Sequence, residues 1–189
     1  MKLQEIYSAS KIFYYMTSGR HAYTITLQVG LTVKVNKEHL CRAVKRAMNV
    51  HPHFYNRPVI SGNKVYTVRQ DRTEIPVFPE TNEGRCYGTE DTYGYLFYVT
   101  FDGTNLYLRM FHGLCDGRGG YMFLRTLLYF YFQECGSIFE PNPDTVTELK
   151  AKEPFDAYRK TLETISENNR KSAGVCLKHF LVTKQVHTS

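Results

Sequence analysis

Two strand-like segments joined by a tight turn constrain most strongly how this 189-residue chain can fold. Residues 95–101 and 105–111 face each other across Asp102-Gly103-Thr104, and Asp-Gly at such a position is typical of a β-hairpin. The second strand leads through a glycine-rich turn, residues 117–120, into a segment at 121–134 that is apolar nearly all round and has helical character. We therefore expect this helix to be buried or to lie at an interface.

The segments before and after this unit predict further strands and helices. They are a strand pair or one long bent strand at 22–35, strands at 64–69 and 73–78, helices at 37–48 and 156–169, and a final strand at 173–183. Asn36 is a suitable N-cap for the first helix, and Pro76 restricts the segment around it to the edge of a sheet. Strands mixed with separated helices, with a hairpin at the centre, predict an α+β layer fold.

Composition limits the class of protein. Hydrophobic residues make up 42% of the chain and charged residues 22%, which excludes a disordered or low-complexity chain. No apolar run approaches the roughly 20 residues that cross a bilayer, and the first residues lack the apolar core of a secretory signal. The five Cys are irregularly spaced without a Cys-x-x-Cys pair, so neither a zinc site nor a disulfide framework is indicated. These features favour a cytoplasmic protein without a membrane span.

The net charge of +6 makes nucleic-acid binding one possible function to consider. Much of the excess lies in residues 150–189, where eight Lys or Arg stand against four Asp or Glu. The two kinds of charge are interleaved and form no dense basic run, which favours a solvated, mildly basic face. We therefore expect no nucleic-acid partner.

A histidine at the junction of the hairpin and the apolar helix is the strongest candidate for chemistry. His112 follows the second strand, where a sheet edge can present its ring to a cleft, and imidazole is the side chain that titrates nearest neutrality. Asp116 is suited to orient His112 or to pin the loop through an Arg, and Gly117 would allow a tight turn. One alternative is a structural role for His112. Another is that Cys115 acts as a thiol nucleophile, although a small buried loop residue is the simpler interpretation of Cys115.

A second histidine pair, His51-Pro52-His53, is compatible with half of a metal site. The sequence indicates no third ligand for a metal ion. We therefore expect a surface loop at this position and no metal.

The motif around His112 resembles the signature of a known family. His112, Asp116 and Gly117 form His-x-x-x-Asp-Gly, the pattern of thioester-dependent acyltransferases that share the chloramphenicol acetyltransferase fold. These include condensation domains of non-ribosomal peptide synthesis and alcohol acetyltransferases. Many members carry two consecutive His; here Phe111 stands first, and His112 takes the place of the second, catalytic one.

The resemblance extends over most of the chain. Residues 46–54 are similar to the family's helix followed by a His-Pro segment, and residues 62–66 are similar to the short strand that comes next. Order and spacing match from about residue 7 to residue 134. The resemblance implies a two-layer α+β sandwich with a mixed or antiparallel sheet and helices on one face.

The resemblance also implies roles for single residues. His112 would take a proton from an acceptor hydroxyl, amine or thiol as that group attacks an acyl thioester, a contribution of about 10²–10⁴-fold. Asp116 would hold the loop by pairing with an Arg, for which Arg57 is the first candidate and Arg20 the second. Tyr55 stands where condensation domains usually have an Arg, a departure that weighs against this pairing.

The resemblance implies that the glycines after Asp116 form the turn and help to bind the co-substrate. Gly117 would give the turn, and the helix N-terminus near Gly119 and Gly120 would help to hold a developing oxyanion or a phosphate. The implied co-substrate is an acyl-CoA or acyl-pantetheine thioester, and no permanently bound cofactor is expected. The acceptor is a small molecule.

The length of the chain implies a single lobe. In the family the catalytic His lies in a channel between two halves, supplied by one long chain or by a trimer. Here 77 residues follow His112, and the second-lobe motif Asp-Phe-Gly-Trp-Gly is absent from a chain without Trp. We expect an N-terminal lobe over 1–140, with 141–189 as a linker plus a helix and strand packing on it. A homo-oligomer or a missing second lobe would complete the cleft; a non-catalytic or truncated half-domain for binding or scaffolding is the alternative.

Overall fold

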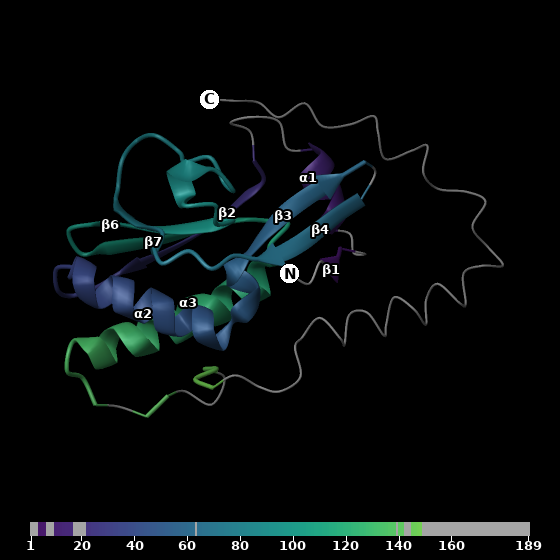
Figure 1. Ribbon diagram of the computed structural model, residues 1–189. Coiled ribbons are helices and arrows are strands. Elements are labelled where there is room, and N and C mark those ends of the chain that lie inside the picture. The colour runs from purple at the N-terminus through teal and green to yellow at the C-terminus, as the bar shows by residue number, and fades with distance from the viewer. Residues whose placement is uncertain are drawn as a thin grey trace. The chain divides into compact units, whose positions relative to one another are not determined.

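The computed structural model describes residues 4–6, 10–16, 22–62, 64–138, 140–141 and 145–148. All of them belong to one unit, residues 1–150 (Figure 1). The predicted helix at 156–169 and the predicted strand at 173–183 lie outside the described residues.

The predicted hairpin forms the centre of a four-stranded mixed sheet. Its strands are β6 (Phe97–Asp102) and β7 (Asn105–Phe111), joined through Gly103, whose positive φ of 55° suits glycine at the turn. The sheet order is β2-β7-β6-β5, with β2 (Thr24–Gly30) antiparallel to β7 and β5 (Val77–Pro79) parallel to β6. The edge position predicted for this segment is confirmed, but the strand covers Val77–Pro79 and not the predicted 73–78.

The segment predicted as a strand pair or one long strand at 22–35 is shorter than expected. Strand β2 ends at Gly30, and the chain then passes the tip of the hairpin. There the Leu31 N–H donates to the Thr104 carbonyl at 2.8 Å, and the Val35 N–H donates to the Gly103 carbonyl at 2.9 Å. The backbone after Gly30 therefore bonds to the hairpin turn instead of extending the strand.

A second, three-stranded antiparallel sheet was not indicated by the sequence. Its order is β1-β4-β3, where β1 is Gln4–Glu5, β4 is Lys64–Arg69 and β3 is Asn56–Ser61. The predicted strand at 64–69 is confirmed, but its partner β3 was missed because Pro58 interrupts the strand pattern. A short helix, α1 (Ser10–Met16), follows β1.

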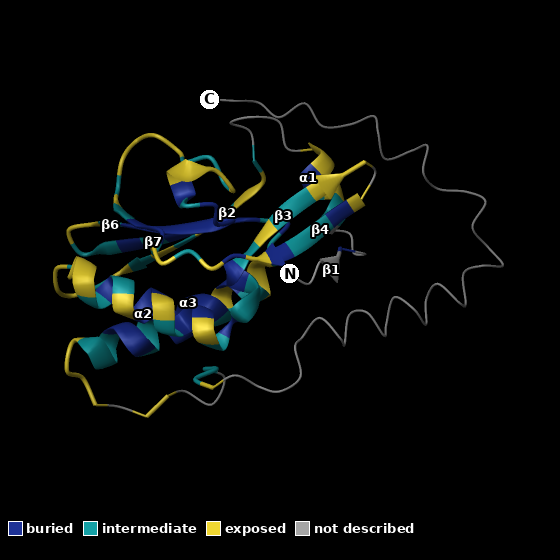
Figure 2. Ribbon diagram, viewed as in Figure 1, coloured by how far each residue is buried: buried dark blue, intermediate teal, exposed yellow. Residues whose placement is uncertain are grey.

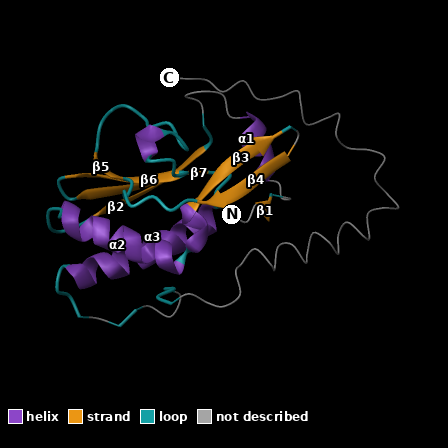
Figure 3. Cartoon of the chain, in the orientation of Figure 1, coloured by secondary structure: helices purple, strands orange, loops and turns teal. Residues whose placement is uncertain are grey.

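Two long helices cover one face of the four-stranded sheet (Figures 1 and 3). They are α2 (Lys37–Val50) and α3 (Gly117–Glu134); two 3₁₀ turns, η1 (Pro52–Tyr55) and η2 (Glu90–Thr92), complete the elements. The predicted cap is confirmed, because the Asn36 side chain accepts from the His39 N–H at 3.1 Å. None of the helices in the described part of the chain has the length and apolar character that crossing a membrane requires.

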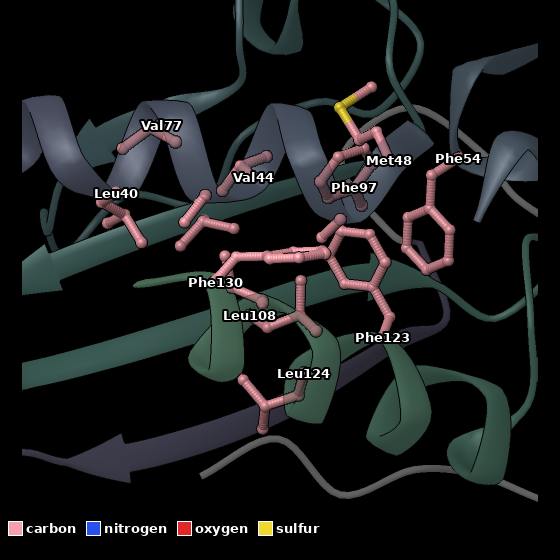
Figure 4. Packing of buried hydrophobic residues seen from close by; sticks show 14 of the residues in the cluster. Leu40, Val44, Met48, Phe54, Val77, Phe97, Leu108, Phe123, Leu124 and Phe130 are labelled. Atoms are coloured by element: carbon pink, nitrogen blue, oxygen red, sulfur yellow. The ribbon is translucent and has the colours of Figure 1, made fainter. Parts of the chain in front are cut away.

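The core lies between these helices and the sheet. Figure 2 shows buried residues along the strands and exposed residues recurring along α2, as expected of an amphipathic helix. In Figure 4, Phe54 and Phe123 lie close together; their ring centroids are 3.8 Å apart, and Phe97 approaches Phe123 at 5.4 Å. Each such buried ring contributes about 1.5–3 kcal/mol of burial free energy. The α+β fold class with a mixed sheet and helices on one face is confirmed.

Candidate active site

His112 lies directly after β7, where the hairpin ends. Its backbone N–H donates to the Tyr23 carbonyl at 2.7 Å, which continues the pairing of β2 and β7 by one step beyond Thr24 and Phe111. The side chain is half-buried, and its imidazole stacks on the Phe13 ring with centroids 4.3 Å apart and planes 18° from parallel. The backbone is thus fixed by the sheet, and one face of the ring is covered by α1.

The turn after His112 depends on a glycine that the sequence reasoning missed. The Leu114 N–H donates to the Phe111 carbonyl at 2.9 Å, so the turn spans His112 and Gly113. A Cβ on buried Gly113 would overlap the Phe111 ring and would lie 2.8 Å from a ring carbon of Tyr14. The Tyr14 hydroxyl donates to the Gly113 carbonyl at 3.2 Å, and burial raises the pKa of Tyr14 far above its ordinary value. Gly113 therefore has no room for a side chain.

Asp116 caps helix α3. Its Oδ1 accepts from the Gly119 N–H at 2.7 Å, and its carbonyl accepts from the Gly120 N–H at 3.0 Å. Among the described residues, the carboxylate makes neither an ion pair with Arg57 nor a hydrogen bond to the His112 ring. The predicted pairing with Arg57 is therefore not formed, and one carboxylate oxygen of Asp116 instead caps α3.

The two arginines considered as partners of Asp116 lie elsewhere. Arg57 is exposed on β3, a strand of the second sheet, and Arg20 lies outside the described residues. Tyr55, which stands where an Arg was expected, donates its hydroxyl to Asn49 Oδ1 at 2.8 Å. The Arg69 guanidinium lies over the Tyr55 ring at 4.4 Å. Tyr55 therefore belongs to a local structural cluster.

The glycine run after Asp116 is part of α3, four residues earlier than the predicted helix start at 121. Gly117 is the first helical residue; its φ is not in the left-handed region, and a Cβ there would meet no neighbouring atom within 4 Å. The predicted turn role of Gly117 is therefore wrong. At Gly120 a Cβ would lie 2.5 Å from Met110 Sδ, so this glycine lets α3 pack closely on β7.

The amides of Gly119 and Gly120 were expected to help hold an oxyanion or a phosphate. Both N–H groups donate to Asp116 instead. The arrangement therefore gives these two glycines a structural role in the cap of α3, and it does not support the predicted ligand contact.

Cys115 is a poor nucleophile in this environment. Its thiol lies 3.3 Å from Met110 Sδ, and burial, with a smaller effect of the Asp116 charge, raises the thiol pKa to about 12. The thiolate needed for attack is therefore rare near neutral pH. This geometry agrees with the simpler interpretation of Cys115 as a small loop residue, although the residue is half-buried and not fully buried.

A surface loop was expected at His51 and His53, but His51 is buried and His53 is half-buried. His51 is buried, with its Nε2 3.0 Å from Thr126 Oγ1; the Thr126 hydroxyl donates to the Val146 carbonyl at 2.7 Å. Because that hydroxyl has one proton, His51 Nε2 must donate the other hydrogen bond. Burial lowers the pKa of His51 to about 4. His53 lies beside it with ring centroids 6.1 Å apart, but within the described part of the chain no three His, Cys, Asp or Glu residues gather as metal ligands.

A charged cluster on the helix-free face of the four-stranded sheet was also missed. Arg109 on β7 donates to both carboxylate oxygens of Glu80 at 2.7 and 2.8 Å, and the Thr100 hydroxyl bonds to the same carboxylate. Burial alone would raise the pKa of Glu80, but the bonds from Arg109 and Thr100 outweigh it and hold that pKa below its ordinary value. None of these bonds involves His112.

Comparisons with known proteins identify the fold. No protein-family model matches the sequence, and no curated protein matches it. Several solved structures are similar to this chain. Three of them are the epimerization domain from the third module of tyrocidine synthetase B (13% identity, TM-score 0.59), the condensation domain of the Monacolin K polyketide synthase MokA (12% identity, TM-score 0.59) and the SgcC5 protein from Streptomyces globisporus (15% identity, TM-score 0.58). At these identities the likeness shows the fold alone.

The chain spans less than half of those structures. The matches cover 93%, 90% and 84% of this chain but 47%, 41% and 41% of the three structures, in the same order. The chain therefore has the fold of one lobe of condensation-domain-like proteins, as the resemblance read from the sequence implied.

Proposed function

We propose that this chain is one lobe of an acyltransferase that moves an acyl group from a CoA or pantetheine thioester to a hydroxyl or amine acceptor. The observation that carries the proposal is the place of His112, a half-buried imidazole directly after β7 in a condensation-domain-like fold. The buried Cys115 thiol does not compete as a nucleophile. The co-substrate is the acyl thioester, and the proposal requires no permanently bound cofactor.

In the proposed mechanism His112 acts as the general base. A ring nitrogen takes the proton from the acceptor O–H or N–H while the acceptor's electron pair attacks the thioester carbonyl carbon. The resulting tetrahedral intermediate collapses, the C–S bond breaks, and the leaving thiolate receives the proton from His112. Asp116 acts only through the chain: by capping α3 it fixes the segment that follows His112.

A second wall of the site comes from outside the described lobe. In the proposal it is supplied by a second copy of this chain or by a separate second lobe. The mass of the protein in solution distinguishes the two, because a chain that completes its own cleft by assembly must be an oligomer.

The test is thiol release from acetyl-CoA and acyl-pantetheine in the presence of panels of alcohols and amines. The proposal predicts acceptor-dependent release that H112A reduces by about 10²–10⁴-fold. H39A is the matched control, since it removes a half-buried histidine on α2, whose ring lies beside Cys135, and should leave the rate unchanged. A folded wild-type protein as inert as H112A would contradict the proposal.

A non-catalytic half-domain is the second candidate. It is favoured by Phe111 in place of the first His of the motif and by the missing pair between Asp116 and Arg57. Under this alternative the protein binds a thioester or a partner without turnover. Saturable binding of acetyl-CoA without acceptor-dependent thiol release would select it.

A further inference from the structure

We propose that Phe13 orients the imidazole of His112, a positioning role that rests on the proposed function of His112 as the base. The two rings stack with centroids 4.3 Å apart and planes 18° from parallel. A face-to-face contact of this kind restricts rotation of the imidazole about its side-chain bonds, because the ring can turn only by giving up the contact.

No hydrogen bond or ion pair from the described part of the chain orients this ring. In many hydrolases and transferases a carboxylate hydrogen-bonds one nitrogen of the catalytic histidine and so fixes its orientation. Here neither ring nitrogen of His112 has a hydrogen bond or an ion pair among the described residues. The nearest carboxylate in the sequence, that of Asp116, is bonded to the Gly119 N–H at the start of α3.

Phe13 is itself held in place by its neighbours. Its ring also meets the Tyr23 ring edge-on at 5.4 Å, with an interplanar angle of 63°. The next residue, Tyr14, is buried; its ring packs edge-on against Phe111 at 4.9 Å, and its hydroxyl donates to the Gly113 carbonyl at 3.2 Å. Helix α1 thus contacts the turn after β7 at two points, the face of the His112 imidazole and the backbone carbonyl of Gly113.

The stack has a consequence for the reaction. With one face of the imidazole covered by Phe13, an acceptor reaches His112 at the ring edge, where the two nitrogens lie. Proton transfer needs a heavy-atom distance of about 2.6–3.2 Å, and misplacement of a catalytic group by 1 Å can cost about 10²-fold in rate. Losing the ring of Phe13 should therefore reduce the rate of the chemical step more than substrate binding.

The orientation is tested by the NMR signal of the His112 Cε1–H group in protein with carbon-13-labelled histidine, assigned with H112A. Stacked on Phe13, this proton is shielded by the ring current; F13L should move its signal downfield, whereas F13Y should leave it near the wild-type position. F78L is the matched control, because Phe78 is also half-buried and lies on β5. A folded F13L protein with an unmoved His112 signal would overturn the proposal. F13M replaces F13L if the leucine variant does not fold.

The kinetic arm separates this proposal from the proposed function. We expect F13L to lower kcat by about 10–100-fold with little change in KM, and F13Y to restore most of the rate. A kcat of F13L equal to that of the wild type would contradict the positioning role. If the wild-type protein shows no turnover at all, the proposed function fails, and the NMR signal of His112 still decides whether Phe13 orients the ring.

Discussion

Replacing Gly113 by alanine tests how tightly the turn after β7 is packed. The added Cβ would overlap the Phe111 ring and would lie 2.8 Å from a ring carbon of Tyr14. Both rings are buried, so neither can swing into solvent. Overpacking of this kind costs about 1–3 kcal/mol of unfolding free energy. For a chain of this length that corresponds to a decrease in Tm of roughly 2–12 °C.

Gly117→Ala is the matched control, four positions along the same segment. A Cβ there meets nothing within 4 Å, and the residue is already helical. Replacing a helical glycine by alanine at a compatible site stabilises by about 0.4–1 kcal/mol. Urea unfolding followed by far-ultraviolet circular dichroism measures both variants. A G113A protein as stable as the wild type, or a G117A protein less stable than G113A, would refute the packing argument.

Three further predictions concern single groups in the same unit. D116A should lose about 1 kcal/mol of unfolding free energy and D116N much less, because asparagine also caps helices; equal urea midpoints for D116A and the wild type would contradict the cap. The folded-state pKa of Glu80 lies below its unfolded value of about 4.3, so its contribution to the free energy of unfolding is complete above that pH and is lost as pH falls through the folded pKa. E80Q should therefore narrow the difference in Tm between neutral and strongly acidic pH. An unchanged difference would count against the pairing of Glu80 with Arg109. His51 has a folded pKa of about 4 against about 6.5 when unfolded, so the unfolded chain binds protons first and stability declines as pH falls between these values. H51Q should make this decline in stability less steep. A decline as steep as that of the wild type would show that His51 does not cause it.

The local elements were predictable from the sequence because their signals are local. The Asp102-Gly103 turn specifies the hairpin, and Asn36 marks the start of α2 through the bond of its own side chain to the His39 N–H. The start of α3 was misplaced because a glycine run indicates a turn by propensity. The carboxylate of Asp116 begins the helix before these glycines, so its cap outweighs their low helix propensity.

The surroundings of His112 were not predictable in the same way. The position of His112 at a strand end follows from the hairpin pattern, but its stacking on Phe13 joins residues that lie far apart in the sequence. The same holds for the burial of His51 beside Thr126 and in part for Gly113, where the distant ring of Tyr14 adds to the crowding by the neighbouring Phe111 ring. Such contacts depend on how elements pack in three dimensions, which neither periodicity nor spacing encodes.

The most direct test of the account is the single-turnover rate of acyl transfer in H112N and D116N, measured against the wild type with saturating acyl thioester. We expect H112N to lose about 10²–10⁴-fold, since asparagine cannot accept the proton, while D116N keeps a rate near that of the wild type because it retains the α3 cap. Equal rates in H112N and the wild type, or equal losses in both variants, would contradict the assignment of His112 as the base.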